Sequence, residues 1–275
     1  MRTSFLSILS LLVLYACNTP KPEKTAPVQP KTADTTAVIE APKELPSGLS
    51  FIRFKFTDKR CDFPELAETE DNTWCNERTV EGLRIALTDM AIAQKINVLL
   101  CKEITGSNGN IQSIKQFVTD IKTASNEEGE PEYLQDTYTV SLGDSSSTFL
   151  SLNIGFDMYA LGAAHGQYGV SVLNVDLKTG NRIGLSDLLV PNYRSALKAI
   201  AKKRFLEQNS EEGGWWFLNG VQPFELSETF RMSSKGITFI YQPYEIGPYA
   251  AGAPEVFLSL KDIQRLLKEN PYIKG

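Results

Sequence analysis

Alternation of hydrophobic and polar positions predicts several β-strands in this chain. Residues 51–56 place phenylalanine or isoleucine beside charged residues in a pattern close to period two, which is typical of a strand with one buried face. Later segments are rich in β-branched and aromatic residues, which favour strands. Further strands are therefore predicted over residues 133–142, 148–159, 168–177, 225–232 and 236–241.

Hydrophobic residues spaced three to four apart predict helices in the intervening segments. Ser259 followed by Asp262 is typical of a helix N-terminal cap. The expected helices cover residues 79–102, 111–124, 193–207 and 259–269, with a short helical turn over 185–189. Strand runs separated by helical segments predict an α+β fold. We expect an antiparallel β-sheet packed by helices, in two small, closely joined subdomains.

The N-terminus has the pattern of an export signal. Arg2 precedes an apolar run over residues 5–16, about the length of a signal-peptide core and shorter than the roughly 20 residues that span a bilayer. Leu14 and Ala16 stand three positions and one position before Cys17, as in the lipobox of bacterial lipoproteins. We expect a signal peptide over 1–16, lipidation of Cys17 and membrane anchoring, with no cytoplasmic domain. An ordinary signal peptide that ends near a cysteine is the alternative.

Composition indicates how the rest of the chain is organised. Residues 17–47 hold six prolines and few large apolar residues, which favours an extended tether. Residues 48–275 are long enough to bury a substantial core. Loss of Arg2 with the signal peptide leaves 27 basic and 33 acidic residues, a net charge of −6. This balance argues against nucleic acid as a partner.

Cysteine and histidine usage limits the chemistry. In an exported chain we expect Cys61 and Cys75 to form a disulfide around a polar loop, and Cys101 to be a small buried residue. The single histidine, His165, and the absence of a Cys-x-x-Cys pair argue against a metal site. The chain also lacks a phosphate-binding glycine loop and a Gly-x-Ser-x-Gly motif, so no cofactor and no nucleophilic catalysis are expected.

Two glycine-rich signatures carry a resemblance to a known family. Residues 161–166 read Leu-Gly-Ala-Ala-His-Gly, and residues 239–252 read Phe-Ile-Tyr-Gln-Pro-Tyr-Glu-Ile-Gly-Pro-Tyr-Ala-Ala-Gly. Together with residues 175–189 they resemble the RsiV-type C-terminal domain family, which usually follows a PdaC-type domain. The resemblance implies a PdaC-type domain over 48–145 and an RsiV-type domain over 146–275.

This pair of domains occurs in a lysozyme-binding anti-sigma factor, in a peptidoglycan deacetylase and in lipoproteins of unknown role. The resemblance therefore implies a lysozyme-like protein or peptidoglycan as the partner. We expect neither the sigma-binding segment nor the deacetylase domain in this sequence.

Three acidic or basic side chains are candidates for catalysis. His165 could act as a general base or a ligand contact; the alternative is a structural histidine that bonds the backbone of its glycine-rich turn. Glu245 and Glu255 could be the carboxylate pair of a glycosidase; the alternative is a chance pair in an acidic chain.

Aromatic residues are candidates for recognition. Trp215 and Trp216 are adjacent in a loop, so one of them could be exposed for stacking on a sugar or a partner; the alternative is a buried aromatic plug. Tyr244 and Tyr249 are further candidates for binding; the alternative is that they pack on the sheet edge and set the shape of their loop. The sequence predicts a non-enzymatic, lipid-anchored binding module of the cell envelope, with a cell-wall carbohydrate hydrolase as the alternative.

Overall fold

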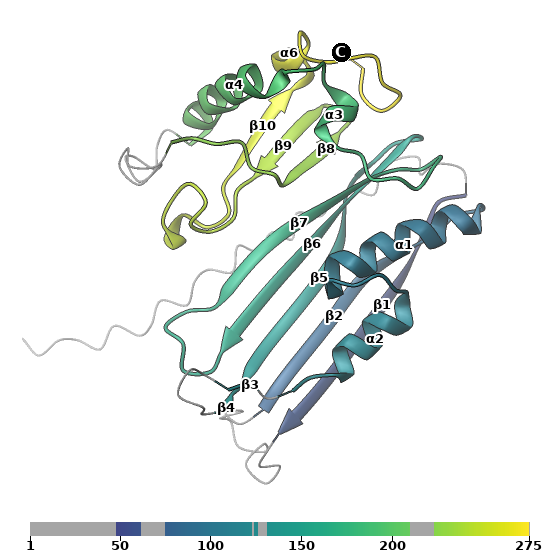
Figure 1. Ribbon diagram of the computed structural model, residues 1–275, viewed down its shortest axis with the longest axis vertical. Helices are drawn as coiled ribbons and strands as arrows, with labels where there is room; N and C mark the ends of the chain where they lie inside the picture. The colour runs from purple at the N-terminus through teal and green to yellow at the C-terminus, as the bar shows by residue number, and fades with distance from the viewer. Residues whose placement is uncertain (1–47, 62–74, 123, 126–130, 210–222, 275) are drawn as a thin grey trace, which may run out of the picture. The chain divides into compact units, whose positions relative to one another are not determined.

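The computed structural model describes residues 48–61, 75–122, 124–125, 131–209 and 223–274. The larger of its two main sheets has five strands in the order β1-β2-β5-β6-β7 (Figure 1). The strands are β1 (Ser50–Cys61), β2 (Cys75–Ala86), β5 (Leu134–Ser145), β6 (Phe149–Ala160) and β7 (Gln167–Asp176). Two further short strands, β3 (Ala124–Ser125) and β4 (Pro131–Glu132), pair with each other. The predicted α+β fold is confirmed.

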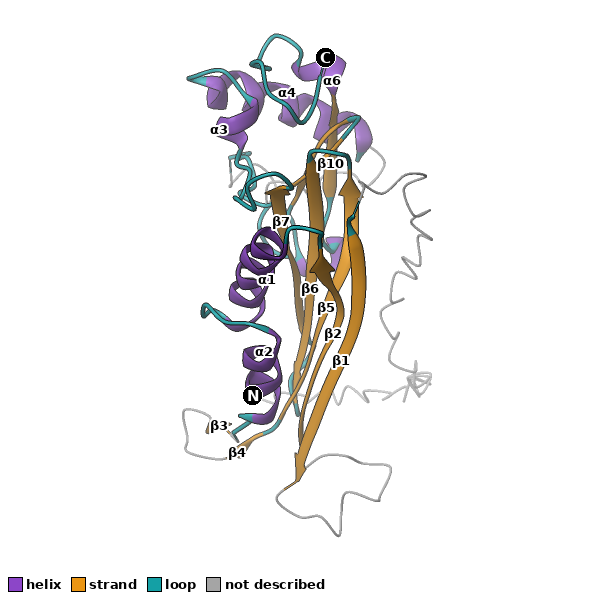
Figure 2. Cartoon of the chain, turned by 90° about the vertical axis from the view of Figure 1, so that its right-hand side faces the viewer, coloured by secondary structure: helices purple, strands orange, loops and turns teal. Residues whose placement is uncertain are grey.

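One pair of strands in the large sheet is parallel. β2 runs parallel to β5, whereas the other neighbours are antiparallel. Helices α1 (Met90–Thr105) and α2 (Ile111–Thr119) lie between β2 and β5 in the chain, and a parallel pair requires a long crossover of this kind. Figure 2 shows both helices along one face of the sheet. Leu100, Ile114 and Leu152 are buried between the two layers.

The helix predicted over residues 79–102 is wrong in its first part. Residues 75–86 form strand β2, which pairs with β1 along its whole length, from Cys61↔Cys75 to Ser50↔Ala86. Helix α1 begins only at Met90, where the Asp89 carboxylate accepts hydrogen bonds from the N–H groups of Ala91 and Ile92. Pairing with a distant strand therefore prevails over a local helical spacing.

A three-stranded antiparallel sheet in the order β10-β9-β8 forms the second region of the structure (Figure 1). Its strands are β8 (Phe230–Ser233), β9 (Gly236–Ile240) and β10 (Glu255–Ser259), and it is accompanied by α3 (Leu185–Leu188), α4 (Tyr193–Gln208), η3 (Tyr249–Ala251) and α6 (Leu260–Ile263). Phe205, Phe224 and Tyr241 pack together in its core. The sequence pattern predicted β9 and α4 but missed β10.

The C-terminal helix is much shorter than predicted. Ser259 caps it as expected, with its hydroxyl accepting from the N–H of Asp262, but α6 ends at Ile263. The following segment forms a bridge between Leu267 and Leu189. These backbone hydrogen bonds to another part of the chain take the place of the helical ones. None of the helices in the described part of the chain has the length and apolar character that crossing a bilayer requires.

Two amide side chains join the regions. Buried Asn174 of β7 donates from Nδ2 to the Phe230 carbonyl at 2.8 Å and accepts at Oδ1 from the Met232 N–H at 3.2 Å. Conversely, the side chain of Gln242, which follows β9, bonds both the N–H and the carbonyl of Val170 in β7. Each amide thus supplies hydrogen bonds that a neighbouring strand would otherwise make.

The predicted domain boundary at residues 145/146 lies between adjacent strands of the five-stranded sheet. β6 and β7, which follow it in the chain, pair with each other, and β6 also pairs with β5, which precedes it. The division into a PdaC-type and an RsiV-type domain stays a prediction.

Candidate binding site

The two glycine-rich segments singled out in the sequence meet in space. The ring of Tyr249 stacks on His165, with centroids 4.1 Å apart and planes inclined by 25°. The Tyr249 hydroxyl donates to the carbonyl of Gly166 at 2.8 Å. His165, from the connection between β6 and β7, is therefore fixed against the loop that follows β9.

The His165 ring is held at both nitrogens. Nδ1 lies 2.8 Å from the Gly166 carbonyl oxygen, and Nε2 lies 3.4 Å from the Tyr244 hydroxyl. The tautomer with its proton on Nδ1 satisfies both contacts, because Nδ1 then donates to the carbonyl and Nε2 accepts from the phenol. As a whole residue, His165 is exposed at the surface.

Tyr244 has an unusual backbone conformation. Its φ is +69°, in the left-handed region that bulky residues seldom adopt. The residue is nevertheless 57% exposed, so burial does not compensate for this strain. A strained residue that exposes an aromatic ring beside a histidine is typical of a functional loop.

Glu245 stabilises the turn that presents Tyr244. Its carboxylate accepts from the Gln242 N–H at 2.8 Å and from the Ser227 hydroxyl at 3.4 Å. The Glu245 N–H in turn donates to the Gln242 carbonyl at 3.0 Å. The carboxylate is therefore engaged in shaping the loop.

Close packing holds this loop against the edge of β7. A Cβ added to Gly169 would lie 2.6 Å from Gln242 Oε1 and 2.6 Å from a ring carbon of Phe156. Glycine at this position therefore allows the Gln242 amide and the Phe156 ring to approach the strand. Phe156 is nevertheless 39% exposed.

A pocket of about 540 Å³ opens between β7 and the loop. Tyr168 meets the edge of Tyr249, with centroids 5.5 Å apart, and burial raises the pKa of both phenols. Both hydroxyls therefore keep their protons at neutral pH. The lining is aromatic with interspersed amides and hydroxyls: Phe156, His165, Gln167, Tyr168, Val170, Ser171, Thr229, Gln242, Pro243, Tyr244 and Tyr249.

The structure thus brings together three of the candidates from the sequence, His165, Tyr244 and Tyr249. The two candidate carboxylates do not line the pocket: Glu245 holds its own turn, and Glu255 pairs with Arg231 at 2.9 Å. Sequence reasoning missed Phe156, Tyr168 and Gln242. Tyr168 stands three residues after His165, and Gln242 lies within the second signature, so position in or beside the signatures was the available signal.

The remaining site predictions concern cysteines and tryptophans. The Cys61–Cys75 disulfide is confirmed, and Cys101 is free and buried, as expected. Cys17, Trp215 and Trp216 lie outside the described residues. Within the described ranges, no three His, Cys, Asp or Glu side chains are grouped as a metal site would require.

A known protein family matches the part of the chain that contains the three-stranded sheet. Residues 186–261 match the family model described as "Protein of unknown function (DUF3298)". This stretch is a DUF3298 domain. It contributes Tyr244 and Tyr249 to the pocket, whereas His165 and Tyr168 precede it in the chain. The pocket is therefore formed jointly by the DUF3298 domain and the edge of the large sheet.

Solved structures show the same fold over most of the chain. A member of the DUF3298 family from Bacteroides fragilis is 19% identical, with a TM-score of 0.68, covering 82% of this chain and 97% of that one. A DUF3298 family protein from Pseudomonas aeruginosa is 17% identical, with a TM-score of 0.59, covering 82% and 98% respectively. At these identities the likeness concerns the fold alone. Comparison with curated proteins finds no significant match.

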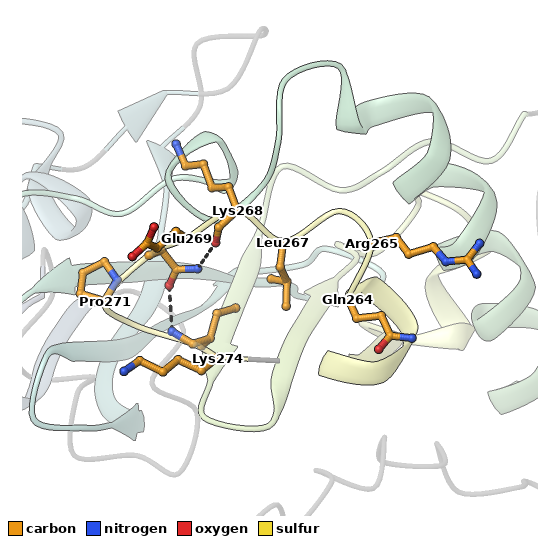
Figure 3. A pocket seen from close by; sticks show the side chains of 9 residues that line it. Gln264, Arg265, Leu267, Lys268, Glu269, Pro271 and Lys274 are labelled. Carbon is orange, nitrogen blue, oxygen red and sulfur yellow. Dashed lines mark hydrogen bonds between the residues drawn. The ribbon is translucent and has the colours of Figure 1, made fainter.

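A larger hollow of about 1040 Å³ lies at the C-terminal end, and all of its lining residues follow the DUF3298 match. The charged ends of Arg265, Lys268 and Lys274 point in three different directions there (Figure 3). Asn270 bonds the local backbone, accepting from the N–H groups of Tyr272 and Ile273. Because its polar groups do not converge, this hollow is a weaker candidate site than the aromatic pocket.

Proposed function

We propose that this protein is a non-enzymatic, lipid-anchored binding module of the cell envelope, and that its aromatic pocket holds a sugar ring of an envelope glycan. The observation that carries the proposal is the convergence of His165, Tyr168, Tyr244 and Tyr249 on one open pocket beside β7. The finer resemblance to RsiV-type domains, which in relatives are associated with cell-wall partners, points the same way.

The chemistry of the pocket suits a carbohydrate. Aromatic rings offer flat apolar faces to the C–H groups of a sugar, and their polar ends remain available for hydrogen bonds. The exposed ring of Tyr244 supplies such a face. Gln167 and Thr229 add an amide and a hydroxyl at the lining, which can bond sugar hydroxyl groups.

The engagement of the two carboxylates favours binding over hydrolysis. A glycosidase needs two carboxyl groups facing one sugar bond. Glu245 accepts from the backbone of its own turn, and Glu255 pairs with Arg231 outside the pocket. Neither is presented to a ligand in the pocket.

Membrane attachment is part of the same proposal. Lipidation of Cys17 would anchor the mature chain, and the proline-rich stretch to residue 47 would hold the folded part away from the bilayer. A shift in mass at the N-terminal peptide, lost in a Cys17→Ala variant, would support this attachment. An unmodified N-terminus on the exported protein would contradict it.

A lysozyme-like protein is the second candidate ligand. The net charge of −6 expected for the mature chain favours association with a strongly basic protein through electrostatic steering. Pull-down with a basic lysozyme at low and at moderate salt tests this version. Absence of binding under both conditions would exclude it.

Calorimetric titration of the full chain in detergent with soluble peptidoglycan fragments tests the glycan proposal, with product analysis of the same samples. We expect saturable binding without cleavage. Tyr244→Ala should weaken it about tenfold, corresponding to about 1.4 kcal/mol. Phe257→Ala is the matched control, since Phe257 is an aromatic residue of β10 that is 38% exposed and does not line the pocket. Cleaved glycan, or equal loss in both variants, would overturn the proposal.

A further inference from the structure

The aromatic pocket has a distinct charge environment. The segments that form most of it, residues 155–171 and 242–254, contain two acidic residues, Asp157 and Glu245, and no lysine or arginine. Glu245 is bound to the backbone of its turn. Asp157 is therefore the acidic group that remains for a ligand.

Asp157 lies beside the aromatic cluster. It is the cross-strand partner of Tyr168 in the β6–β7 ladder, so both side chains project from the same face of the sheet as close neighbours. Burial raises the pKa of Tyr249, and the charges of Tyr168 and Asp157 raise it further. The carboxylate thus acts electrostatically on the ring that stacks on His165.

The Asp157 carboxylate has no protein partner among the described residues. The side chain is exposed, and no hydrogen bond or ion pair engages it in the ranges that the structure describes. By contrast, Asp136 of β5 is paired with Arg78 at 2.7 Å. Asp157 does not itself line the pocket, but it is the cross-strand neighbour of Tyr168, which does. An unpaired carboxylate in this position favours a positively charged ligand.

The aromatic rings also favour a positively charged ligand. The faces of tyrosine and phenylalanine attract ammonium groups within about 6 Å of the ring centre, and an acidic residue nearby adds to that attraction. Phe156, Tyr168, Tyr244 and Tyr249 supply four such rings around one pocket. A neutral sugar would stack on these rings without using the charge.

We infer that the pocket selects an amino sugar with a free, protonated amine over the same sugar in its N-acetylated form, with Asp157 as the counter-charge. This inference rests on the proposed glycan binding and names the ligand class. N-acetylation removes the positive charge while leaving the ring and its hydroxyl groups, so the two forms differ in the feature that Asp157 recognises.

The test compares two trisaccharides on the full chain by calorimetry at neutral pH and low salt: the β-1,4-linked glucosamine trimer and the N-acetylglucosamine trimer. We expect the glucosamine trimer to bind about tenfold more tightly. Tetramethylammonium chloride should compete with it, whereas sodium chloride at the same ionic strength should compete less.

The variants locate the effect. Asp157→Asn should reduce the tenfold preference to about twofold or less, chiefly by weakening binding of the glucosamine trimer. Glu269→Gln, which removes an exposed charge from the C-terminal segment, should keep the full preference. Because Asp157 is exposed and unpaired in the described part, the variant is expected to fold normally, which circular dichroism checks.

Each contrary outcome has a separate meaning. Equal binding of both trimers would overturn the inference and leave the glycan proposal standing, whereas failure of both trimers and of peptidoglycan fragments would remove the glycan proposal itself. A preference that persists in Asp157→Asn, or that falls equally in Glu269→Gln, would overturn the role of Asp157. A trilysine peptide that binds as tightly as the glucosamine trimer would overturn the assignment to a sugar.

Discussion

The two sheets bury their strands in different ways. The five-stranded sheet uses strands of 10 to 12 residues, with α1 and α2 over one face. Polar cross-strand pairs such as Lys55–Glu81 and Thr57–Thr79 lie between the positions that face the helices. The three-stranded sheet uses strands of 4 or 5 residues, and in β9 every residue except Thr238 is buried.

This difference indicates that the two sheets have different roles. The long sheet is a platform whose edge strand β7 is available to other parts of the chain, and the short sheet is a small core that projects a loop onto that edge. The pocket forms where the two meet: the large sheet and its β6–β7 connection supply Phe156, His165 and Tyr168, and the loop after β9 supplies Tyr244 and Tyr249.

The largest effect on stability is expected inside the large sheet. Arg78 pairs with Asp136, whose side chain is 5% exposed, and lies 4.1 Å from the ring centre of Phe117. Arg78→Met should lower the free energy of unfolding by about 4 kcal/mol, because it leaves a buried carboxylate without its counter-charge. Urea titration measures this loss. The double variant Arg78→Met/Asp136→Leu should recover most of it, and a single-variant loss below about 1 kcal/mol would contradict the role of the pair.

The disulfide is the next largest contribution to this same region. Cys61 and Cys75 are 14 residues apart, and closing such a loop stabilises the folded state by about 3 kcal/mol. Reduction should therefore lower the urea midpoint. The variant Cys61→Ala/Cys75→Ala should start from that lowered midpoint and show no response to reductant; a response there would assign the effect to another group.

Removing the side-chain hydrogen bonds that join the two regions should let them unfold independently. Asn174→Leu leaves the Phe230 carbonyl and the Met232 N–H without their partner, at a cost of about 2 kcal/mol. We expect unfolding to lose cooperativity, with fluorescence and circular dichroism following different midpoints. Gln242→Leu, at a less buried position, should cost about 1 kcal/mol but also weaken ligand binding. Coincident transitions in Asn174→Leu would show that the regions are coupled by other contacts.

The smallest effect concerns the C-terminal segment. Burial raises the pKa of Asp176, but hydrogen bonds from the Tyr272 hydroxyl and from the N–H groups of Thr179 and Lys178 outweigh it, and the pKa lies below its usual value. The resulting stability is present above the unfolded pKa of about 3.9 and is lost as the pH falls through the folded value.

Tyr272→Phe removes the 2.7 Å hydrogen bond to Asp176 and should cost about 1 kcal/mol at neutral pH. Urea titrations between neutral and acidic pH should show the variant and the original chain converging as Asp176 becomes protonated. A constant difference at all pH values would mean that the hydroxyl does not act through the carboxylate.

Strands with a strong local pattern were predictable. β5, β6 and β7 are long and rich in β-branched and aromatic residues, so their existence follows from the chain alone. Residues 75–86 were not predictable, because Leu83, Ile85 and Ala86 fit a helical spacing as well as a strand, and pairing with β1 decides between them. β10 was missed for a related reason: only five residues long, it is defined by its pairing with β9.

The candidate site was likewise predictable only in part. Local sequence was enough to single out His165, Tyr244 and Tyr249, and to expect the bond between Cys61 and Cys75, because unusual residue types in glycine-rich or polar stretches are visible without any fold. That His165 contacts residues 79 and 84 positions away, that Tyr168 joins them and that Glu245 is held by its own turn follows from packing. Distances between side chains depend on how strands pair across the whole chain, and spacing along the backbone does not contain that information.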